Sequence, residues 1–160
     1  MRHIISMLVE NQPGVLTRIA GMFARRGFNI ETITVGKTGN PSISKMVVTV
    51  LGDAHMLEQI EKQINKLVDT VKVQELKPEA SIERELCLLK IAIPDNKSKQ
   101  DILKYADIYK TKVVDIDKKS VTVQIVGESD KIDSFIELVR SYGIKDISRT
   151  GVTAIARSNG

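Results

Sequence analysis

The sequence predicts an α+β fold made of two ferredoxin-like βαββαβ domains in tandem. Short β-branched runs alternate with segments of helical periodicity, and the same order occurs twice. Leu51-Gly52-Asp53 and Val126-Gly127-Glu128 hold the same place in the two halves, between a third strand and a second helix. The chain has 160 residues, 42% of them apolar, which suits two small globular domains. We expect these domains to be residues 1–76 and 77–160.

The first half opens with the apolar run Ile4–Val9, which is typical of a buried strand. Asn11 is predicted to cap the following helix, Pro13 suits its first turn, and Gly27 suits a left-handed stop. The inward face of this helix is expected at positions spaced three and four apart, namely Leu16, Ile19, Ala20 and Phe23.

Two more strands, a second helix and a closing strand complete the first half. The two strands are Asn29–Val35 and Ile43–Leu51, with Gly36–Pro41 as a polar turn between them. Asp53 is expected to cap the second helix, with Glu58 and Lys62 paired on its outside. Its inward face is expected to be Leu57, Ile60, Ile64 and Leu67, before a strand over Val71–Leu76.

The second half repeats this order after a polar bridge that contains Pro78. The expected strands are Leu86–Ile93, Val113–Ile116, Val121–Val126 and one within Ile144–Ala156, with a hairpin turn at residues 117–120. The expected inward faces are Ile102, Leu103, Ala106 and Tyr109 for the first helix, and Ile132, Phe135, Ile136 and Val139 for the second. Gly143 is expected to stop the second helix.

Composition argues against nucleic-acid and membrane functions. The net charge of +4 divides evenly, since residues 1–76 hold nine basic and seven acidic residues and residues 77–160 hold fifteen and thirteen. No clustered basic face results, and the strands Ile4–Val9 and Ile43–Leu51 lack the aromatics on which an RNA-binding domain of this topology stacks bases. A transcriptional regulator would need a DNA-reading helix pair, which this pattern does not contain. No run approaches a membrane span or a signal peptide, so we expect a cytoplasmic protein.

Motifs for catalysis and metal binding are also missing from the sequence. Cys87 lies in an apolar run and is expected to be a buried thiol, whereas His3 and His55 are expected to be surface residues. Their spacing resembles no zinc or iron site. Neither a nucleophile elbow nor a phosphate-binding loop is present. We therefore expect no catalytic residue and no metal ligand.

The turn Asn11–Leu16 is the candidate binding feature. It places Pro13 and Gly14 at a helix N-terminus, where backbone N–H groups lack intrahelical partners and the helix dipole favours an anion. Asn29 is a second amide that could reach the same space. Together they would suit the carboxylate and ammonium of a free amino acid. Taken alone, the same residues are more typical of a plain cap, a turn and a polar strand start.

Longer strings in the chain resemble a known family. They include Val9–Ile19, Arg25–Glu31, Leu57–Ile64, Glu83–Leu86 and Arg149–Gly151. These resemble the small, regulatory subunit of acetolactate synthase (acetohydroxyacid synthase), in order and over nearly the whole chain. The first half is thereby similar to an ACT domain, a ligand-sensing ferredoxin-like module, and the second to the C-terminal domain of that subunit.

The resemblance implies a non-catalytic regulatory subunit of branched-chain amino acid biosynthesis. It implies a homodimer formed through the ACT domains, which binds a branched-chain amino acid such as valine. The ligand would lie against Asn11, Pro13, Gly14, Val15 and Leu16 of one copy and near Asn29 and Ile30 of its partner. A separate large catalytic subunit would carry thiamine diphosphate, magnesium and FAD, so no cofactor is expected on this chain. A stand-alone ACT-type amino-acid sensor with a different partner is the alternative.

Overall fold

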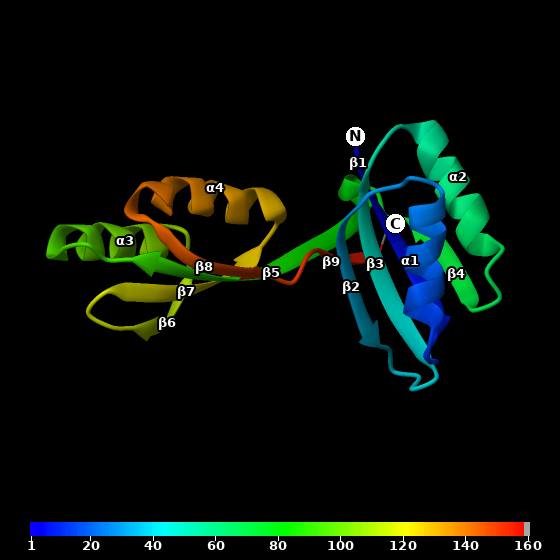
Figure 1. Cartoon of the computed structure of the whole chain (residues 1–160), viewed down its shortest axis with the longest axis horizontal. Coiled ribbons are helices and arrows are strands. Elements are labelled where there is room, and N and C mark those ends of the chain that lie inside the picture. The colour runs from blue at the N-terminus through cyan, green and yellow to red at the C-terminus, as the bar shows by residue number, and fades with distance from the viewer. Residues whose placement is uncertain (159–160) are drawn as a thin grey trace. The chain divides into compact units, whose positions relative to one another are not determined.

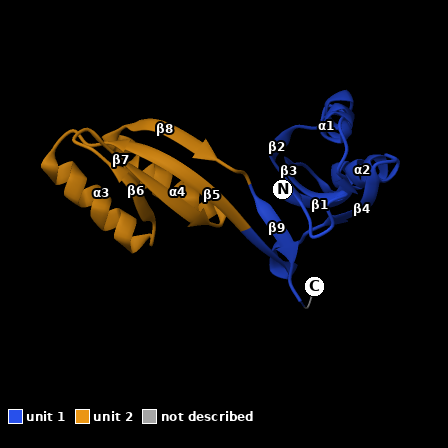
Figure 2. Cartoon of the chain, turned by 90° about the horizontal axis from the view of Figure 1, so that it is seen from below, with its two compact units in different colours: residues 1–83, 152–160 blue, residues 84–151 orange. Residues whose placement is uncertain are grey.

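The computed structural model describes residues 1–158, which form two compact units (Figure 2). Unit 1 holds Met1–Glu83 together with the segment from Val152 onward, and unit 2 holds Arg84–Gly151. This division differs from the expected one at residues 76 and 77. The chain passes into unit 2 along one long strand, and its last segment returns to unit 1 (Figure 2).

Unit 1 has the expected βαββαβ order (Figure 1). Its elements are β1 (Arg2–Glu10), α1 (Val15–Arg25), β2 (Ile30–Lys37), β3 (Ile43–Leu51), α2 (Ala54–Asn65) and β4 (Thr70–Glu75). The strands form an antiparallel sheet in the order β2-β3-β1-β4, with β2 and β4 at its edges. Both helices pack on one face, over a core that includes Ile5, Val48 and Ile60.

Local signals at the helix ends of unit 1 were confirmed where they depend on neighbouring residues. The Asp53 side chain accepts a hydrogen bond of 2.8 Å from the backbone N–H of Met56, as an N-cap does. Gly27 has a φ of +69°, and the backbone N–H of Phe28 donates to the carbonyl of Phe23. This closes α1 in the predicted left-handed manner.

The start of α1 differs from the prediction. Gly14, with a φ of +86°, is the N-cap, and no side chain caps the helix. The Asn11 amide instead donates to the carbonyl oxygen of Pro41 at 2.9 Å. The helix is also rotated, so that its buried residues are Val15, Ile19, Met22 and Phe23. Leu16, expected to face inward, is 50% exposed.

The sheet face of unit 1 opposite the helices is partly covered by the end of the same chain. Val152 and Ala154 are buried there against Ile4, Val47 and Leu76. β9 (Thr153–Ala156) pairs with β5 (Ser81–Ala92), which follows the short 3-10 helix η1 (Pro78–Ala80). The backbone of Val152 also bonds the Thr32 and Thr34 hydroxyls. The expected single strand within Ile144–Ala156 is therefore two strands, separated at Gly151, whose φ is +79°.

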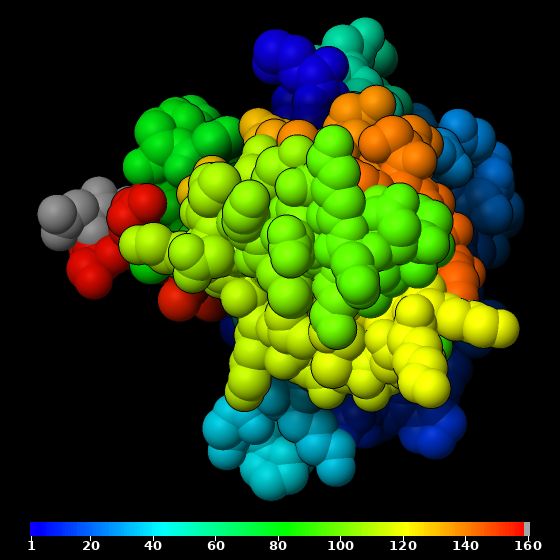
Figure 3. Space-filling model, turned by 90° about the vertical axis from the view of Figure 1, so that its left-hand side faces the viewer, coloured from blue at the N-terminus to red at the C-terminus, as the bar shows by residue number. Residues whose placement is uncertain are grey.

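Unit 2 repeats the topology. Its elements are β5, α3 (Asn96–Ile108), β6 (Lys112–Ile116), β7 (Ser120–Gly127), α4 (Ser129–Val139), η2 (Arg140–Tyr142) and β8 (Ile144–Arg149), with strand order β6-β7-β5-β8. The Asp117 carboxylate accepts from the backbone N–H groups of Lys119 and Ser120, which closes the predicted β6–β7 hairpin. This turn (yellow) projects from the surface in Figure 3. The predicted α4 face is buried, as is Cys87, and burial raises the pKa of that thiol.

An ion-pair network ties together the strands at which the chain enters and leaves unit 2. Glu85 is 3% exposed and accepts two hydrogen bonds of 2.8 Å from the Arg149 guanidinium and one of 3.0 Å from Ser129. Arg149 also bonds Asp133 on α4. The guanidinium lowers the pKa of Glu85. Glu85 and Arg149 lie in two of the strings that resemble the known family, and these charge-assisted hydrogen bonds show that both residues stabilise the fold of unit 2.

His3 is not the surface residue that we expected. It is 6% exposed, its Nδ1 lies 2.8 Å from a carboxylate oxygen of Glu75, and its Nε2 lies 3.3 Å from the carbonyl oxygen of Gly52. The sequence could not indicate this, because Glu75 is 72 residues away and reaches His3 only through the pairing of β1 with β4. His55 is exposed, as expected.

Candidate functional site

The candidate site is the turn between β1 and α1 of unit 1. Gly14 serves as N-cap without a side-chain hydrogen bond, so the first N–H groups of α1 have no side-chain acceptor. The Val15 N–H makes only a long bond of 3.4 Å to the Gln12 carbonyl. An uncapped helix N-terminus carries partial positive charge and attracts a carboxylate.

A guanidinium lies over this turn, and the sequence did not reveal it. Arg18 Nε donates to Asp69 Oδ2 at 2.6 Å, and Asp69 is 8% exposed. A Cβ added to Gly14 would stand 3.0 Å from Arg18 Nη1, so the guanidinium closely borders the glycine. The hydrogen bond to Asp69 raises the pKa of Arg18. Arg18 lies four residues after Gly14, a spacing that places two helical residues side by side, so the sequence held a signal for this contact. Asp69 lies 51 residues after Arg18, and no local spacing could indicate its contact.

The two amides expected to share the site are engaged in different places. Asn11 Nδ2 donates to Pro41, and Asn29 Nδ2 donates to a carboxylate oxygen of Glu31 at 3.1 Å. Both of these contacts use the amide nitrogen. The amide oxygens take no part in them, and an amide oxygen is an acceptor suited to an ammonium group. In a single copy, Asn11 and Asn29 do not meet.

The strand register shows how far apart the two parts lie. The Asn11 N–H bonds the Ser42 carbonyl just before β3 begins, whereas Ile30 pairs with Val50 near its end. β3 has nine residues, and an antiparallel strand rises ~3.4 Å per residue, so the two parts are separated by about 25 Å along the sheet. The expected site residues therefore lie in two groups at opposite ends of the sheet.

The predicted site residues divide accordingly. Asn11, Pro13, Gly14 and Leu16 are exposed together at the turn. Val15 is 3% exposed and belongs to the core, so it contributes its backbone to the turn but presents no side chain to a ligand. Asn29 is exposed and Ile30 is half-buried at the far end. The turn can bind an anion, with the half-exposed Leu16 as an apolar neighbour.

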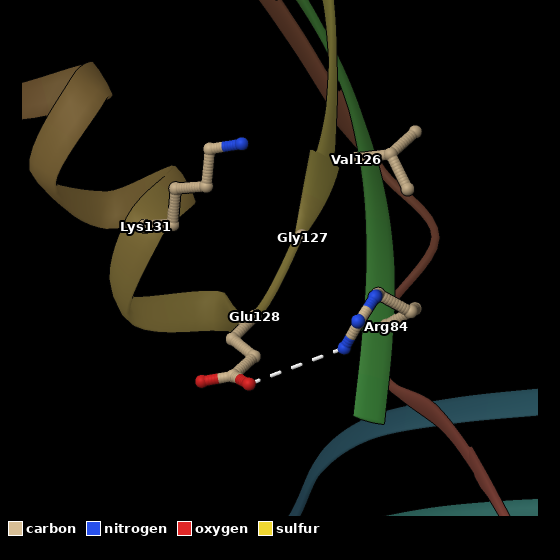
Figure 4. A pocket seen from close by; sticks show the side chains of 5 residues that line it. All are labelled: Arg84, Val126, Gly127, Glu128 and Lys131. Atoms are coloured by element: carbon tan, nitrogen blue, oxygen red, sulfur yellow. Dashed lines mark ion pairs between the residues drawn. The ribbon is translucent and has the colours of Figure 1, made fainter. Parts of the chain in front are cut away.

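A pocket of about 310 Å³ in unit 2 has a different character (Figure 4). It is lined by Arg84, Val126, Gly127, Glu128 and Lys131. Figure 4 shows Arg84 and Glu128 facing each other, as an ion pair of 4.0 Å. The opposite charges at its rim give this pocket no clear preference for an anion or a cation.

Residues 1–158 contain neither a metal-binding group of side chains nor a membrane-spanning helix. In that part of the chain, no group of three or more His, Cys, Asp or Glu side chains is arranged to hold a metal ion. The helices of the same residues are too short or too polar to cross a membrane.

Comparisons with known proteins agree over both units. The family model described as AHAS small subunit-like ACT domain matches residues 5–72, and the model described as small subunit of acetolactate synthase matches residues 84–158. The chain is 49% identical to a Methanothermobacter thermautotrophicus protein named "Probable acetolactate synthase small subunit", covering 98% of this chain and 94% of that protein. It is 39% identical to the acetolactate synthase isozyme 3 small subunit of Escherichia coli, covering 99% and 98%.

A solved structure supports the same conclusion. The crystal structure of the acetolactate synthase small subunit from Thermotoga maritima superposes with a TM-score of 0.91 at 41% identity, covering 100% of this chain and 99% of that one. The βαββαβ order of unit 1, the matches of both units and the near full-length identity place this chain in the family of acetolactate synthase small subunits, with an ACT domain in its first half.

Proposed function

We propose that the chain is the regulatory subunit of an acetolactate synthase. It forms a homodimer through unit 1, binds a branched-chain amino acid, with valine as the first candidate, and confers activation and feedback inhibition on a large catalytic subunit. One observation carries the effector site. An anion-attracting turn and the remaining expected site residues lie at opposite ends of one sheet, so a second copy is needed to join them.

The exposed edge of unit 1 offers a way to join the two half-sites. β2 is an edge strand whose backbone can pair with β2 of a second copy. A two-fold axis makes such a pair antiparallel, so the start of one β2 lies beside the end of the other. Lys37, at the end of β2, pairs with Ser44 at the sheet end where the turn lies. The partner's Asn29 and Ile30 would then approach Gly14.

The chemistry of the joined site fits an α-amino acid. The N-terminus of α1 and the Arg18 guanidinium attract the carboxylate, while the oxygens of Asn11 and of the partner's Asn29 can accept from the ammonium. Leu16 and the partner's Ile30 offer apolar contact. Burying a valine side chain contributes ~1.5–3 kcal/mol. After the cost of association, dissociation constants from micromolar to millimolar follow, which suits sensing of an end product.

In this proposal the chain carries no cofactor. The thiamine diphosphate, magnesium and FAD belong to the large subunit, which condenses pyruvate. The small subunit acts by coupling, and allosteric couplings of ~1–3 kcal/mol change an affinity by about 5- to 150-fold. Such a coupling is sufficient for feedback inhibition.

The function is tested by assaying acetolactate formation by the catalytic chain of the same organism, with and without this protein, while valine is titrated. We expect a higher rate when the protein is present, together with a valine sensitivity that the catalytic chain lacks alone. Calorimetric valine binding without any change in rate or sensitivity would instead indicate a stand-alone sensor with a different partner.

A further inference from the structure

The β6 strand of unit 2 is an exposed, apolar sheet edge. β7 is its one neighbouring strand among the described residues. All five of its residues are exposed, including Val113 at 37%, Val114 at 46% and Ile116 at 44%. α3 and β6 lie at the surface that faces the viewer in Figure 3, in green and yellow-green. An apolar edge strand of this kind is a template for pairing with another strand.

The residues of β6 form a pattern that is complementary to itself. Val113 pairs with Val123 and Ile116 with Val121, so both point toward the helix side of the sheet, where Val121 and Val123 are buried. Lys112 and Asp115 pair with Gln124 and Thr122 on the opposite side. The register shift between Val113 and Asp115 allows two residues three apart to share a side.

One antiparallel register brings together apolar residues on the helix side and opposite charges on the other. It places Val113 opposite Ile116 of a second β6, and Lys112 opposite Asp117, the residue that directly follows the strand. The central residues of this register are Val114 and Asp115, which lie opposite each other. Each contact occurs twice because the pairing is two-fold. A shift by one residue in either direction would bring Lys112 opposite Ile116 or Val113 opposite Asp117. Either shift would pair residues whose side chains point to different sides of the sheet, so both registers are unfavourable.

We propose that β6 is a second self-association edge, which pairs antiparallel with β6 of another copy in this register. The partner is a second copy because one chain supplies both Lys112 on the strand and its complement Asp117 directly after it. Five residues bury little area, so this contact is weak and depends on concentration. It adds to any dimer formed through unit 1, and therefore builds higher oligomers from dimers.

Register-specific cross-linking tests the pairing in the full-length chain. The variant V113C/I116C is expected to oxidise to a covalent dimer that dithiothreitol reverses. The two new thiols are about 10 Å apart along one strand, too far to bridge within a chain. The native Cys87 is buried and does not compete. The single variants V113C and I116C are the controls, because each places its thiol opposite a residue that is not cysteine.

Sedimentation provides the second readout. We expect the mass of the wild-type protein to increase with concentration, and V114E to abolish this increase, because the register places residue 114 opposite the partner's Asp115 and the two carboxylates repel. V71E is the matched control, since Val71 is 57% exposed on the edge strand of the other sheet and should leave the increase intact. Cross-linking of the single variants as extensive as that of V113C/I116C would overturn the proposal. So would an absence of cross-linking in folded V113C/I116C, or a V114E variant that associates like the wild type.

Discussion

Replacing Gly14 by aspartate is expected to weaken effector binding strongly while the chain stays folded. Gly14 has a φ of +86°, and aspartate and asparagine tolerate this region best among other residues, at a cost of about 1 kcal/mol. The added Cβ would meet Arg18 Nη1 at 3.0 Å, which is the end of a flexible side chain and can move. The new carboxylate would then lie beside the guanidinium that we assign to the effector.

The loss of affinity follows from charge. Two carboxylates about 4 Å apart repel by roughly 1 kcal/mol in water and about 4 kcal/mol at an effective dielectric of 20. This corresponds to a weakening of about 5- to 1000-fold. Isothermal titration calorimetry with valine measures it, and Gly14→Asn is the control because it has the same shape and backbone tolerance without the charge. Equal losses in Gly14→Asp and Gly14→Asn, or none in Gly14→Asp, would refute the electrostatic reasoning.

Three further outcomes are expected. Arg18→Ala should weaken valine binding about tenfold by removing a charge-assisted donor, whereas Arg18→Lys should restore part of it; unchanged calorimetry for Arg18→Ala would contradict this role. Val152→Ala should lower the urea stability of unit 1 by about 2 kcal/mol, because Val152 is 2% exposed, while Ile155→Ala on the same segment, 54% exposed, should change it by less than about 0.5 kcal/mol. The pKa of Glu85 is lowered from 4.5 by Arg149, so its ionised form stabilises the fold at neutral pH and this contribution is lost as the pH falls below about 4.5. Glu85→Gln should cost about 2 kcal/mol at pH 7 and show a flatter decline below pH 5, as measured by denaturation at each pH.

The parts of the fold that were predictable depend on neighbours in sequence. Apolar periodicity identified the elements of both units, and Asp53, Gly27 and the Asp117 turn act through residues two to five positions away. Asn11 is a residue type that caps helices, but its side-chain amide donates to the carbonyl oxygen of Pro41, 30 residues further along the chain. Leu16 fitted a helical stripe, yet the helix begins at Val15 and turns that residue inward instead.

The parts that were not predictable depend on tertiary contacts. The run Ile144–Ala156 has strand character throughout, and periodicity cannot show that the residues after Gly151 cover the sheet of the other unit. Asp69 orients Arg18 from a loop 51 residues away, and His3 meets Glu75 only through strand register. The site residues at the turn were predicted from local chemistry and from the family resemblance, and they stay a prediction. Their separation from Asn29 became visible only in the strand register.

The claim most open to direct test is that each effector site is shared between two copies. Gly14→Asp damages the turn and Asn29→Ala the start of β2, so homodimers of either variant should have no site that binds valine with wild-type affinity. In a heterodimer of the two variants, one site receives both lesions and the other receives neither. Heterodimers isolated with two affinity tags can therefore be titrated with valine calorimetrically. The account predicts one valine bound with wild-type affinity per heterodimer, against two for the wild-type dimer. A heterodimer that binds none would contradict it, because each chain would then need both of its own half-sites.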